Sequence, residues 1–146
     1  MDFTAPVSAL MTRKLITVSP LDRMSAVKEI LDQHKVHHIL VVRHTKLVGM
    51  ISKSDYIQFV KCADTSATDK LIESSKLYSY TVEEVMTKGL ATLESSDRIN
   101  VALQVFSENL FHAIPIVDND EVVGILTTYD IIKGLLEEDY ARIKAN

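Results

Sequence analysis

The spacing of hydrophobic residues changes along this chain from short continuous runs to helical periods, and the same order of changes occurs twice. Apolar runs predict strands, and apolar residues three or four positions apart predict helices. The first occurrence predicts a strand at 15–18, a helix that buries Met24, Val27, Ile30 and Leu31, strands at 39–42 and 47–51, and a helix from about residue 54. Asp22 is the expected N-cap of the first of these helices.

The second occurrence repeats the first at a displacement of 75 residues, so that residues 7–60 reappear as residues 82–135. It predicts a strand at 90–93, a helix at 97–108, strands at 114–117 and 122–126 around an Asp-Asn-Asp turn, and a helix from about residue 129. The matches include Met11-Thr12 with Met86-Thr87, His37 with His112, and Val48-Gly49 with Val123-Gly124. Two β-α-β-β-α copies are too few for a solenoid, so we expect them to close on each other.

This repeat predicts the organisation of the chain. We expect a first copy at 1–60, a linker at 61–80 and a second copy at 81–146, together forming one α+β module. Thr81 and Glu84 have the spacing of a capping box for a helix that continues to Met86.

Composition excludes several classes of protein. The net charge of −4 gives no basic surface that would favour nucleic acid as the main ligand. Cys62 is the single cysteine, so an internal disulfide is impossible, and no apolar run is long enough to span a bilayer. We therefore expect a cytoplasmic protein without a membrane partner.

One motif in each copy carries candidate chemistry. Gly-Met-Ile-Ser-Lys-Ser-Asp at 49–55 and Gly-Ile-Leu-Thr-Thr-Tyr-Asp at 124–130 both place a hydroxyl residue and an aspartate at the start of a predicted helix. A carboxylate can accept two hydrogen bonds from vicinal ribose hydroxyls, and free N–H groups at a helix N-terminus suit a phosphate. The alternative is that Asp55 and Asp130 only cap their helices.

Metal binding and catalysis are less favoured. His34, His37, His38 and His44 form a histidine-rich stretch, and His34 and His38 would align on one face if that segment were helical. The predicted helix ends near residues 33–35, however, and no carboxylate or cysteine accompanies them. Because catalytic motifs are also missing from the sequence, we do not expect an enzyme.

The ordered set of motifs resembles the cystathionine β-synthase (CBS) domain, present here as a tandem pair. The resemblance rests on Met-Thr, a strand containing threonine, Asp-Arg before a helix, Ile-Pro-Ile-Val-Asp at 114–118 and the glycine-to-aspartate motif, and it extends from about Val7 to Leu135. It implies two repeats packed sheet to sheet with pseudo-twofold symmetry, and two clefts that bind adenine nucleotides or related adenosyl ligands.

The resemblance also implies the residues of the two clefts. Each cleft would combine the base-facing wall of one copy with the hydroxyl–aspartate corner of the other. The expected sites are Ile16, Val36, His37 and His38 with Thr127 and Asp130, and Ala91, Phe111 and His112 with Ser52 and Asp55. The histidines occupy phosphate-contacting positions of the family, and Arg13, Lys53 and Lys88 are further candidates for phosphate contact.

We thus expect a regulatory sensor of AMP, ADP, ATP or an S-adenosylmethionine-like ligand, with no cofactor required. Its output would pass to an unknown effector protein, and the resemblance implies a homodimer formed through helices. The alternative is a dimerisation or docking module whose clefts hold no ligand. Leu40, which replaces the proline found at position 115, and Ser52, which replaces the commoner threonine, are departures that do not block ligand binding.

Overall fold

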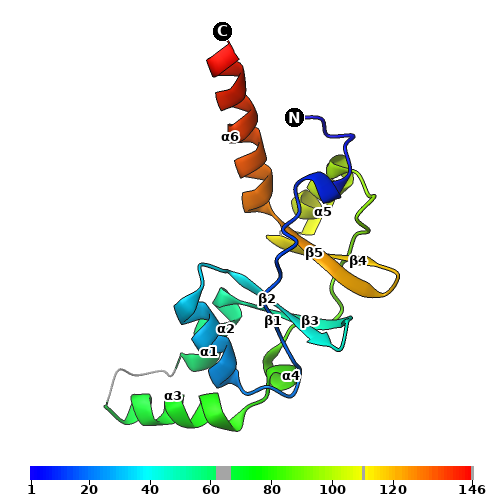
Figure 1. Cartoon of the computed structure of the whole chain (residues 1–146). Coiled ribbons are helices and arrows are strands. Elements are labelled where there is room, and N and C mark those ends of the chain that lie inside the picture. Colours follow the sequence, from blue (N-terminus) through cyan, green and yellow to red (C-terminus); the bar gives the residue numbers. More distant parts are fainter. Residues whose placement is uncertain (62–66, 110, 146) are drawn as a thin grey trace. The chain divides into compact units, whose positions relative to one another are not determined.

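The computed structural model describes residues 1–61, 67–109 and 111–145, which form two compact units (Figure 1). Unit 1 consists of Met1–Leu15 and Ala91–Asn146, and unit 2 of Ile16–Leu90. The elements, in chain order, are the 3₁₀ helix η1 (Val7–Ala9), β1 (Thr17–Val18), α1 (Met24–Gln33), β2 (His38–Arg43), β3 (Lys46–Ser52), α2 (Lys53–Val60), α3 (Ala67–Ser79), α4 (Val82–Val85), α5 (Ile99–Asn109), β4 (Ala113–Asp118), β5 (Glu121–Thr127) and α6 (Thr128–Ala145).

Unit 2 is a three-stranded sheet covered on one face by helices. The strands are ordered β1-β2-β3, with β1 parallel and β3 antiparallel to β2. Alternate β2 residues Ile39 and Val41 point into a core that also contains Met24 and Val27 of α1 and Ile51 of β3. The burial predicted for α1 is confirmed, because Ile30 and Leu31 also pack against this core.

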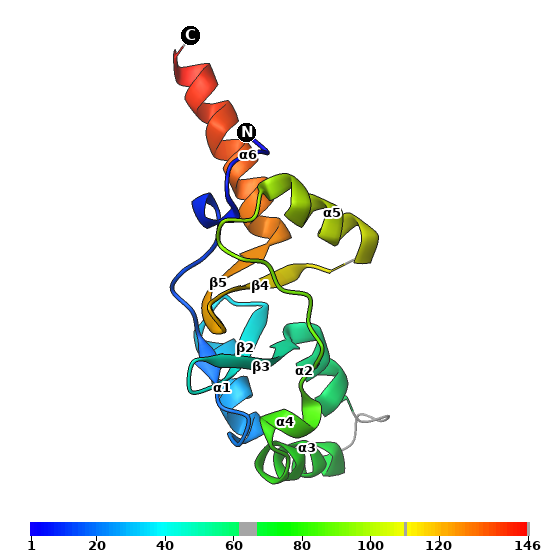
Figure 2. The same cartoon turned by 90° about the vertical axis from the view of Figure 1, so that its right-hand side faces the viewer.

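Unit 1 repeats this arrangement around the antiparallel pair β4-β5. Helices α5 and α6 lie on the same side of the pair in both views (Figure 2). Ile114 and Ile116 of β4 point into a core with Ile99 and Phe106 of α5. These β4 residues stand 75 positions after Ile39 and Val41, so the sequence repeat is also a repeat of core positions. The predicted α+β class and the β-α-β-β-α order are confirmed.

The first strand of each copy is shorter than predicted. The expected strand at 15–18 is reduced to β1, and the expected strand at 90–93 is a single parallel bridge between Leu93 and Ile116. The backbone bonds at this bridge run from Leu93 N–H to Pro115 O and from Val117 N–H to Leu93 O, at 3.2 and 2.8 Å. This bridge matches the β1 pair Val18–Val41 in the other copy.

Asp22 is not the N-cap of α1, which corrects the sequence prediction. The helix begins at Met24, and Arg23 occupies the N-cap position without a side-chain bond. Asp22 Oδ2 instead accepts a hydrogen bond from Ser19 N–H at 2.8 Å, and Asp97 does the same for Glu94 N–H in the second copy. Each aspartate therefore closes the turn before a helix. The capping box predicted at Thr81 and Glu84 is present.

The compact units do not coincide with the sequence repeats, because the Met-Thr segment of each copy joins the sheet of the other. Thr12 forms a two-bond antiparallel bridge with Ile125 of β5, at 2.9 and 3.0 Å. Thr87 forms the equivalent bridge with Met50 of β3, also at 2.9 and 3.0 Å. The start of the first copy thus belongs to unit 1, and the start of the second copy belongs to unit 2.

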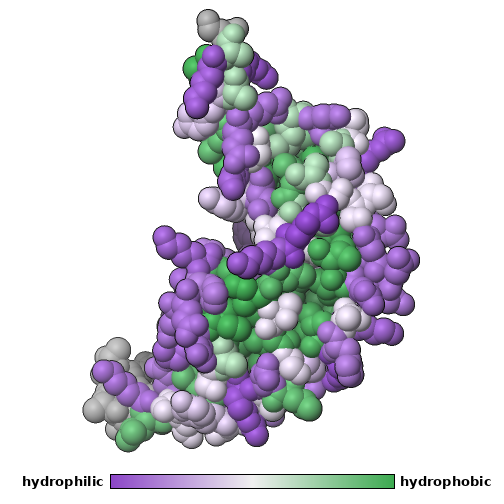
Figure 3. Space-filling model, viewed as in Figure 1, coloured by the Kyte–Doolittle hydropathy of each residue, from purple (hydrophilic) through white to green (hydrophobic). Residues whose placement is uncertain are grey.

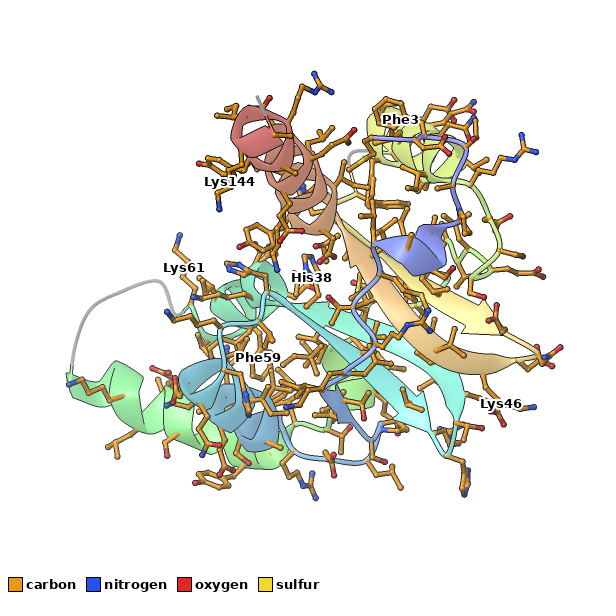
Figure 4. All side chains as sticks on the ribbon, turned by 45° about the horizontal axis from the view of Figure 1, so that its top comes forward. Phe3, His38, Lys46, Phe59, Lys61 and Lys144 are labelled. Carbon is orange, nitrogen blue, oxygen red and sulfur yellow. The ribbon has the colours of Figure 1, made fainter. Side chains whose placement is uncertain are left out.

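The predicted linker contains a helix that belongs to unit 2. Helix α3 packs against α1, and its Leu77 is buried in the core of that unit. Phe59 of α2 makes an edge contact with Tyr80 at a centroid separation of 5.4 Å, and the Lys76 ammonium lies 5.8 Å from the Phe59 ring centre (Figure 4). Cys62 lies outside the described residues. In the described part of the chain, no helix combines the length and apolar character needed to cross a membrane.

Candidate functional site

The first hydroxyl–aspartate corner lies where β3 ends and α2 begins. Ser52 is the N-cap of α2, and Ser52 Oγ accepts a hydrogen bond from Asp55 N–H at 3.0 Å. Asp55 Oδ2 accepts from Ser52 N–H at 2.8 Å, which completes a capping box. Both side chains are half-buried. Among the described residues, Asp55 Oδ1 has no hydrogen bond, so this oxygen is available as an acceptor.

The second corner lies at the junction of β5 and α6, and its aspartate accepts more hydrogen bonds than Asp55 does. Asp130 Oδ2 accepts from Thr127 N–H at 2.8 Å and from the Thr127 hydroxyl at 2.6 Å. Asp130 Oδ1 accepts from the Thr12 hydroxyl at 3.3 Å. A carboxylate offers about four lone-pair sites, so Asp130 retains less free acceptor capacity than Asp55. The two corners thus have the same capping hydrogen bonds and differ in the number of carboxylate lone pairs left to accept further hydrogen bonds.

The N-termini of α2 and α6 offer fewer free N–H groups than the sequence suggested. Lys53 N–H donates to His37 O at 2.8 Å, and Thr128 N–H donates to His112 O at 3.1 Å. The N–H groups of Asp55 and Asp130 donate to the hydroxyls at the N-cap positions. Because the first and third helical N–H groups are used in both helices, these termini are poorer phosphate sites than we expected.

Among the predicted wall residues, the three histidines His37, His38 and His112 lie next to the corner of their own unit. In unit 2, His38 begins β2 and pairs in register with Ser52 (Figure 4). Val36 is half-buried and His37 is exposed, while Ile16 is half-buried just before β1. In unit 1, Ala91, Phe111 and His112 are all exposed, and Phe111 retains 43% of its accessible surface.

The predicted site residues are divided between the two compact units. Unit 2 contains one set (Ile16, Val36, His37, His38, Ser52 and Asp55), and unit 1 contains the other (Ala91, Phe111, His112, Thr127 and Asp130). Within each unit, a backbone hydrogen bond connects a predicted wall histidine to the helix that starts at the corner: Lys53 N–H donates to His37 O, and Thr128 N–H donates to His112 O. Arg13 donates to Ser8 O at 3.2 Å, while Lys53 and Lys88 are exposed.

Thr12 belongs to the second corner and was not among the predicted site residues. Its backbone bridge to Ile125 places its hydroxyl next to Asp130. The signal for it was the recurrence of Met-Thr in both copies, but a repeated dipeptide does not reveal which strand it joins.

The histidine-rich stretch does not have the geometry of a metal site. His34 is the residue after α1 and has an extended backbone, and His38 lies in β2, so the two are not on one helical face. Within the described residues, no group of three or more histidine, cysteine, aspartate or glutamate side chains could hold a metal ion.

Curated relatives are similar over most of this chain and longer than it. An uncharacterized protein of Methanocaldococcus jannaschii is 24% identical over 123 residues, which cover 84% of this chain and 44% of that protein. Inosine-5′-monophosphate dehydrogenase of Thermoplasma acidophilum is 25% identical over 124 residues, covering 84% of this chain and 22% of the enzyme. The chain thus spans less than half the length of these relatives.

Solved structures with this fold include proteins with bound adenosyl ligands. CBSX2, a CBS-pair protein of Arabidopsis thaliana, has a TM-score of 0.77 and 26% identity, with 97% of this chain and 98% of that chain covered. A structure of CBSX2 in complex with AMP gives a TM-score of 0.76, also at 26% identity, with coverage of 91% and 97%. The CBS domain pair of protein MJ0100, in complex with 5′-methylthioadenosine and S-adenosyl-L-methionine, has a TM-score of 0.73 and 25% identity, with coverage of 92% and 98%.

The family model of the CBS domain matches this chain twice, at residues 7–61 and 82–137. These matches include both hydroxyl–aspartate corners and both Met-Thr segments. The chain therefore belongs to the CBS domain family and carries two of these domains in tandem.

Proposed function

We propose that this chain is a regulatory module that binds an adenine nucleotide or a related adenosyl ligand, with the ribose held at a hydroxyl–aspartate corner. The observation that carries the proposal is the half-buried aspartate at each corner, held in position by its own capping box. A carboxylate fixed in this way is ready to accept hydrogen bonds from two vicinal hydroxyls without first losing side-chain entropy. Asp55, whose Oδ1 is open among the described residues, is the better prepared of the two.

Ligands of related proteins support the adenosyl class. CBSX2 binds AMP, and the domain pair of MJ0100 binds 5′-methylthioadenosine and S-adenosyl-L-methionine. These ligands share an adenosine group and differ in the substituent at the 5′ carbon. A site that recognises ribose and base would accept all of them, and AMP, ADP, ATP and an S-adenosylmethionine-like ligand are therefore all candidates here.

We assign the base to the apolar wall residues and the remaining part of the ligand to the histidines. Ile16, Val36 and Ala91 offer aliphatic contacts, and the exposed ring of Phe111 offers a face for stacking. His37 and His112 have exposed side chains, and each uses its carbonyl to bind the first helical residue of the adjacent corner. An imidazole held there would donate to a phosphate or a carboxylate of the ligand.

The proposed output is a change in affinity for an effector protein and involves no chemical reaction. A ligand shifts a conformational equilibrium only by its differential affinity for the two states. The effector therefore has to distinguish the ligand-bound from the ligand-free form.

Replacing Asp55 or Asp130 with asparagine tests this assignment. An asparagine oxygen can still accept the N-cap bond, so the helix start is retained, but the charge and one acceptor oxygen are lost. We expect AMP affinity at the altered corner to fall roughly ten- to a hundredfold, because a hydrogen bond to a charged group contributes about 1.5–3 kcal/mol. Isothermal titration calorimetry measures the affinity and the stoichiometry.

Asp22→Asn and Asp97→Asn are the matched controls. These aspartates also accept one backbone N–H at 2.8 Å, one in each unit, but they lie at turns outside the corners. We expect both controls to bind AMP as the unaltered chain does. If Asp55→Asn and Asp130→Asn also bound with unchanged affinity and stoichiometry, the corners would be helix caps only and the assignment would be wrong.

A further inference from the structure

The second corner receives a hydrogen bond from a distant part of the chain. The Thr12 hydroxyl donates to Asp130 Oδ1 at 3.3 Å, across 118 positions of sequence. The backbone bridge to Ile125 holds Thr12 there, with Thr12 N–H donating at 2.9 Å and Thr12 O accepting at 3.0 Å. Residues paired across two strands lie on the same face, and Thr127 is two positions after Ile125, so the side chains of Thr12 and Thr127 share that face.

The Asp130 carboxylate has little capacity left to accept hydrogen bonds from a ligand. Thr127 N–H and the Thr127 hydroxyl both donate to Oδ2, and the Thr12 hydroxyl donates to Oδ1. These donors occupy three of about four acceptor sites on a carboxylate. Two vicinal ribose hydroxyls need two sites. A ribose that donates both hydroxyls to Asp130 therefore has to displace one of the donors already present.

Thr12 is the donor that a ligand displaces most readily. Its 3.3 Å bond exceeds the range of about 2.5–3.0 Å that is typical of O–H···O bonds, whereas the Thr127 bonds are 2.6 and 2.8 Å long. The Thr12 side chain is exposed and Asp130 is half-buried, so solvent reaches the pair. Helix α6, which starts at this corner, has hydrophilic residues interleaved with hydrophobic ones along its visible surface (Figure 3). Rotation of the Thr12 side chain would release Oδ1 and leave the backbone bridge intact.

The first copy has the same bridge without this bond. Thr87 pairs with Met50 through two hydrogen bonds at 2.9 and 3.0 Å, and Ser52 follows Met50 by two positions. Within unit 2, however, the described residues donate a single hydrogen bond to the Asp55 carboxylate, from Ser52 N–H, and none from the Thr87 hydroxyl. The bridge therefore forms whether or not the threonine hydroxyl contacts the aspartate.

We propose that the Thr12 hydroxyl competes with the ligand's ribose for Asp130 Oδ1 and so lowers the affinity of this corner. The inference rests on the proposed function, because it concerns the same ribose site. A ligand at Asp55 finds the second carboxylate oxygen open within unit 2. A ligand at Asp130 must replace a donor that the bridge keeps beside the carboxylate. Two corners of unequal affinity respond over a wider range of ligand concentration than two equal ones.

Each corner is measured by itself in a full-length chain in which the other corner is weakened. Calorimetric titration of Asp55→Asn with AMP reports the Asp130 corner, and titration of Asp130→Asn reports the Asp55 corner. Adding Thr12→Val to Asp55→Asn removes the hydroxyl but keeps the size and β-branching of the side chain, so the bridge to β5 is retained. We expect AMP affinity to rise about two- to tenfold, the range for one competing hydrogen bond.

Two further variants separate competition from a general effect on the fold. Thr12→Ser in the Asp55→Asn chain keeps the hydroxyl and should restore the lower affinity. Thr87→Val in the Asp130→Asn chain is the matched control, because Thr87 occupies the equivalent bridge but does not bond to Asp55 within unit 2. We expect this control to leave AMP affinity unchanged. An affinity that is unchanged, lower or undetectable with Thr12→Val, or that rises equally with Thr87→Val, overturns the proposal.

The same titrations distinguish this inference from the proposed function. If the unaltered chain and both single-corner chains bind no AMP, ribose binding at the corners and competition by Thr12 are both wrong. If AMP binds and Asp55→Asn and Asp130→Asn each weaken it, but Thr12→Val does not raise the affinity, only competition by Thr12 is wrong.

Discussion

At the scale of single residues, Gly49 and Gly124 allow the Met-Thr segments to pack against β3 and β5, because a side chain at either position would collide with the segment. A Cβ on Gly49 would lie 2.8 Å from Met86 Cγ and 2.9 Å from the Thr87 carbonyl oxygen. A Cβ on Gly124 would lie 2.7 Å from Met11 Sδ and 3.2 Å from the Thr12 carbonyl oxygen. Each glycine lacks the Cβ that would collide with the Met-Thr segment, which explains why the glycine and the Met-Thr pair occur together in both copies.

We predict that Gly49→Ala and Gly124→Ala destabilise the protein by about 1–3 kcal/mol in urea unfolding, with Gly49→Ala the more severe. The order follows because a backbone carbonyl oxygen would lie closer than 3.0 Å at Gly49, whereas at Gly124 only a flexible side chain comes that close. Met11→Ala should therefore recover much of the loss at Gly124, while Met86→Ala should recover less at Gly49. Equal costs and equal rescue would contradict this explanation.

At the scale of elements, the sequence predicted best where a residue acts on its nearest neighbours. Strands β2 to β5 were predicted within one residue at each end, because buried β-branched runs indicate them directly. The start of α1 was wrong because an aspartate near a helix start can cap the helix or close the preceding turn, and residue type alone does not separate these roles. The lengths of the short strands before α1 and α5 depend on how far they pair with β2 and β4, and the hydrophobic pattern along the sequence does not predict that pairing.

The capping box of α4 gives a prediction about pH. Glu84 accepts hydrogen bonds from Thr81 N–H at 2.8 Å and from the Thr81 hydroxyl at 2.9 Å, and these bonds lower the pKa of Glu84 below its usual value of 4.5. A lowered folded-state pKa contributes stability above pH 4.5 that is lost as the pH falls through the folded value. Glu84→Gln should thus be less stable than the unaltered chain at about pH 7, with a difference that shrinks in acid. A difference independent of pH in urea titrations would contradict the role of the carboxylate.

At the scale of the whole molecule, sequence repeats and compact units are different divisions of the same chain. Self-similarity located the copies and the corners, since these are properties of local sequence. It did not locate the partner of Met11-Thr12 or Met86-Thr87, because each segment joins a strand that lies in the other copy. For the same reason, the contribution of Thr12 to the Asp130 corner could not be predicted from the sequence.

This division predicts which fragments fold. Residues 16–90 contain the complete unit 2, including Thr87 bridged to Met50, and should unfold cooperatively in circular dichroism melts. Residues 1–75 have the same length but lack Val82, which is fully buried in the core of unit 2, and the bridging segment. We expect that fragment to melt without a cooperative transition, since so short a chain has little stability in reserve. Cooperative melting of 1–75 would show that the sequence repeat is the folding unit.

The most direct test of ligand sensing by this chain is calorimetric titration of the unaltered full chain with AMP, followed by ATP and S-adenosylmethionine. We predict saturable binding of at least one of these ligands that is weakened by Asp55→Asn or Asp130→Asn and unchanged by Asp22→Asn and Asp97→Asn. A folded chain that releases or absorbs no heat with any of the three, and shows no rise in melting temperature at millimolar ligand, would contradict the proposal that this CBS pair senses an adenosyl ligand.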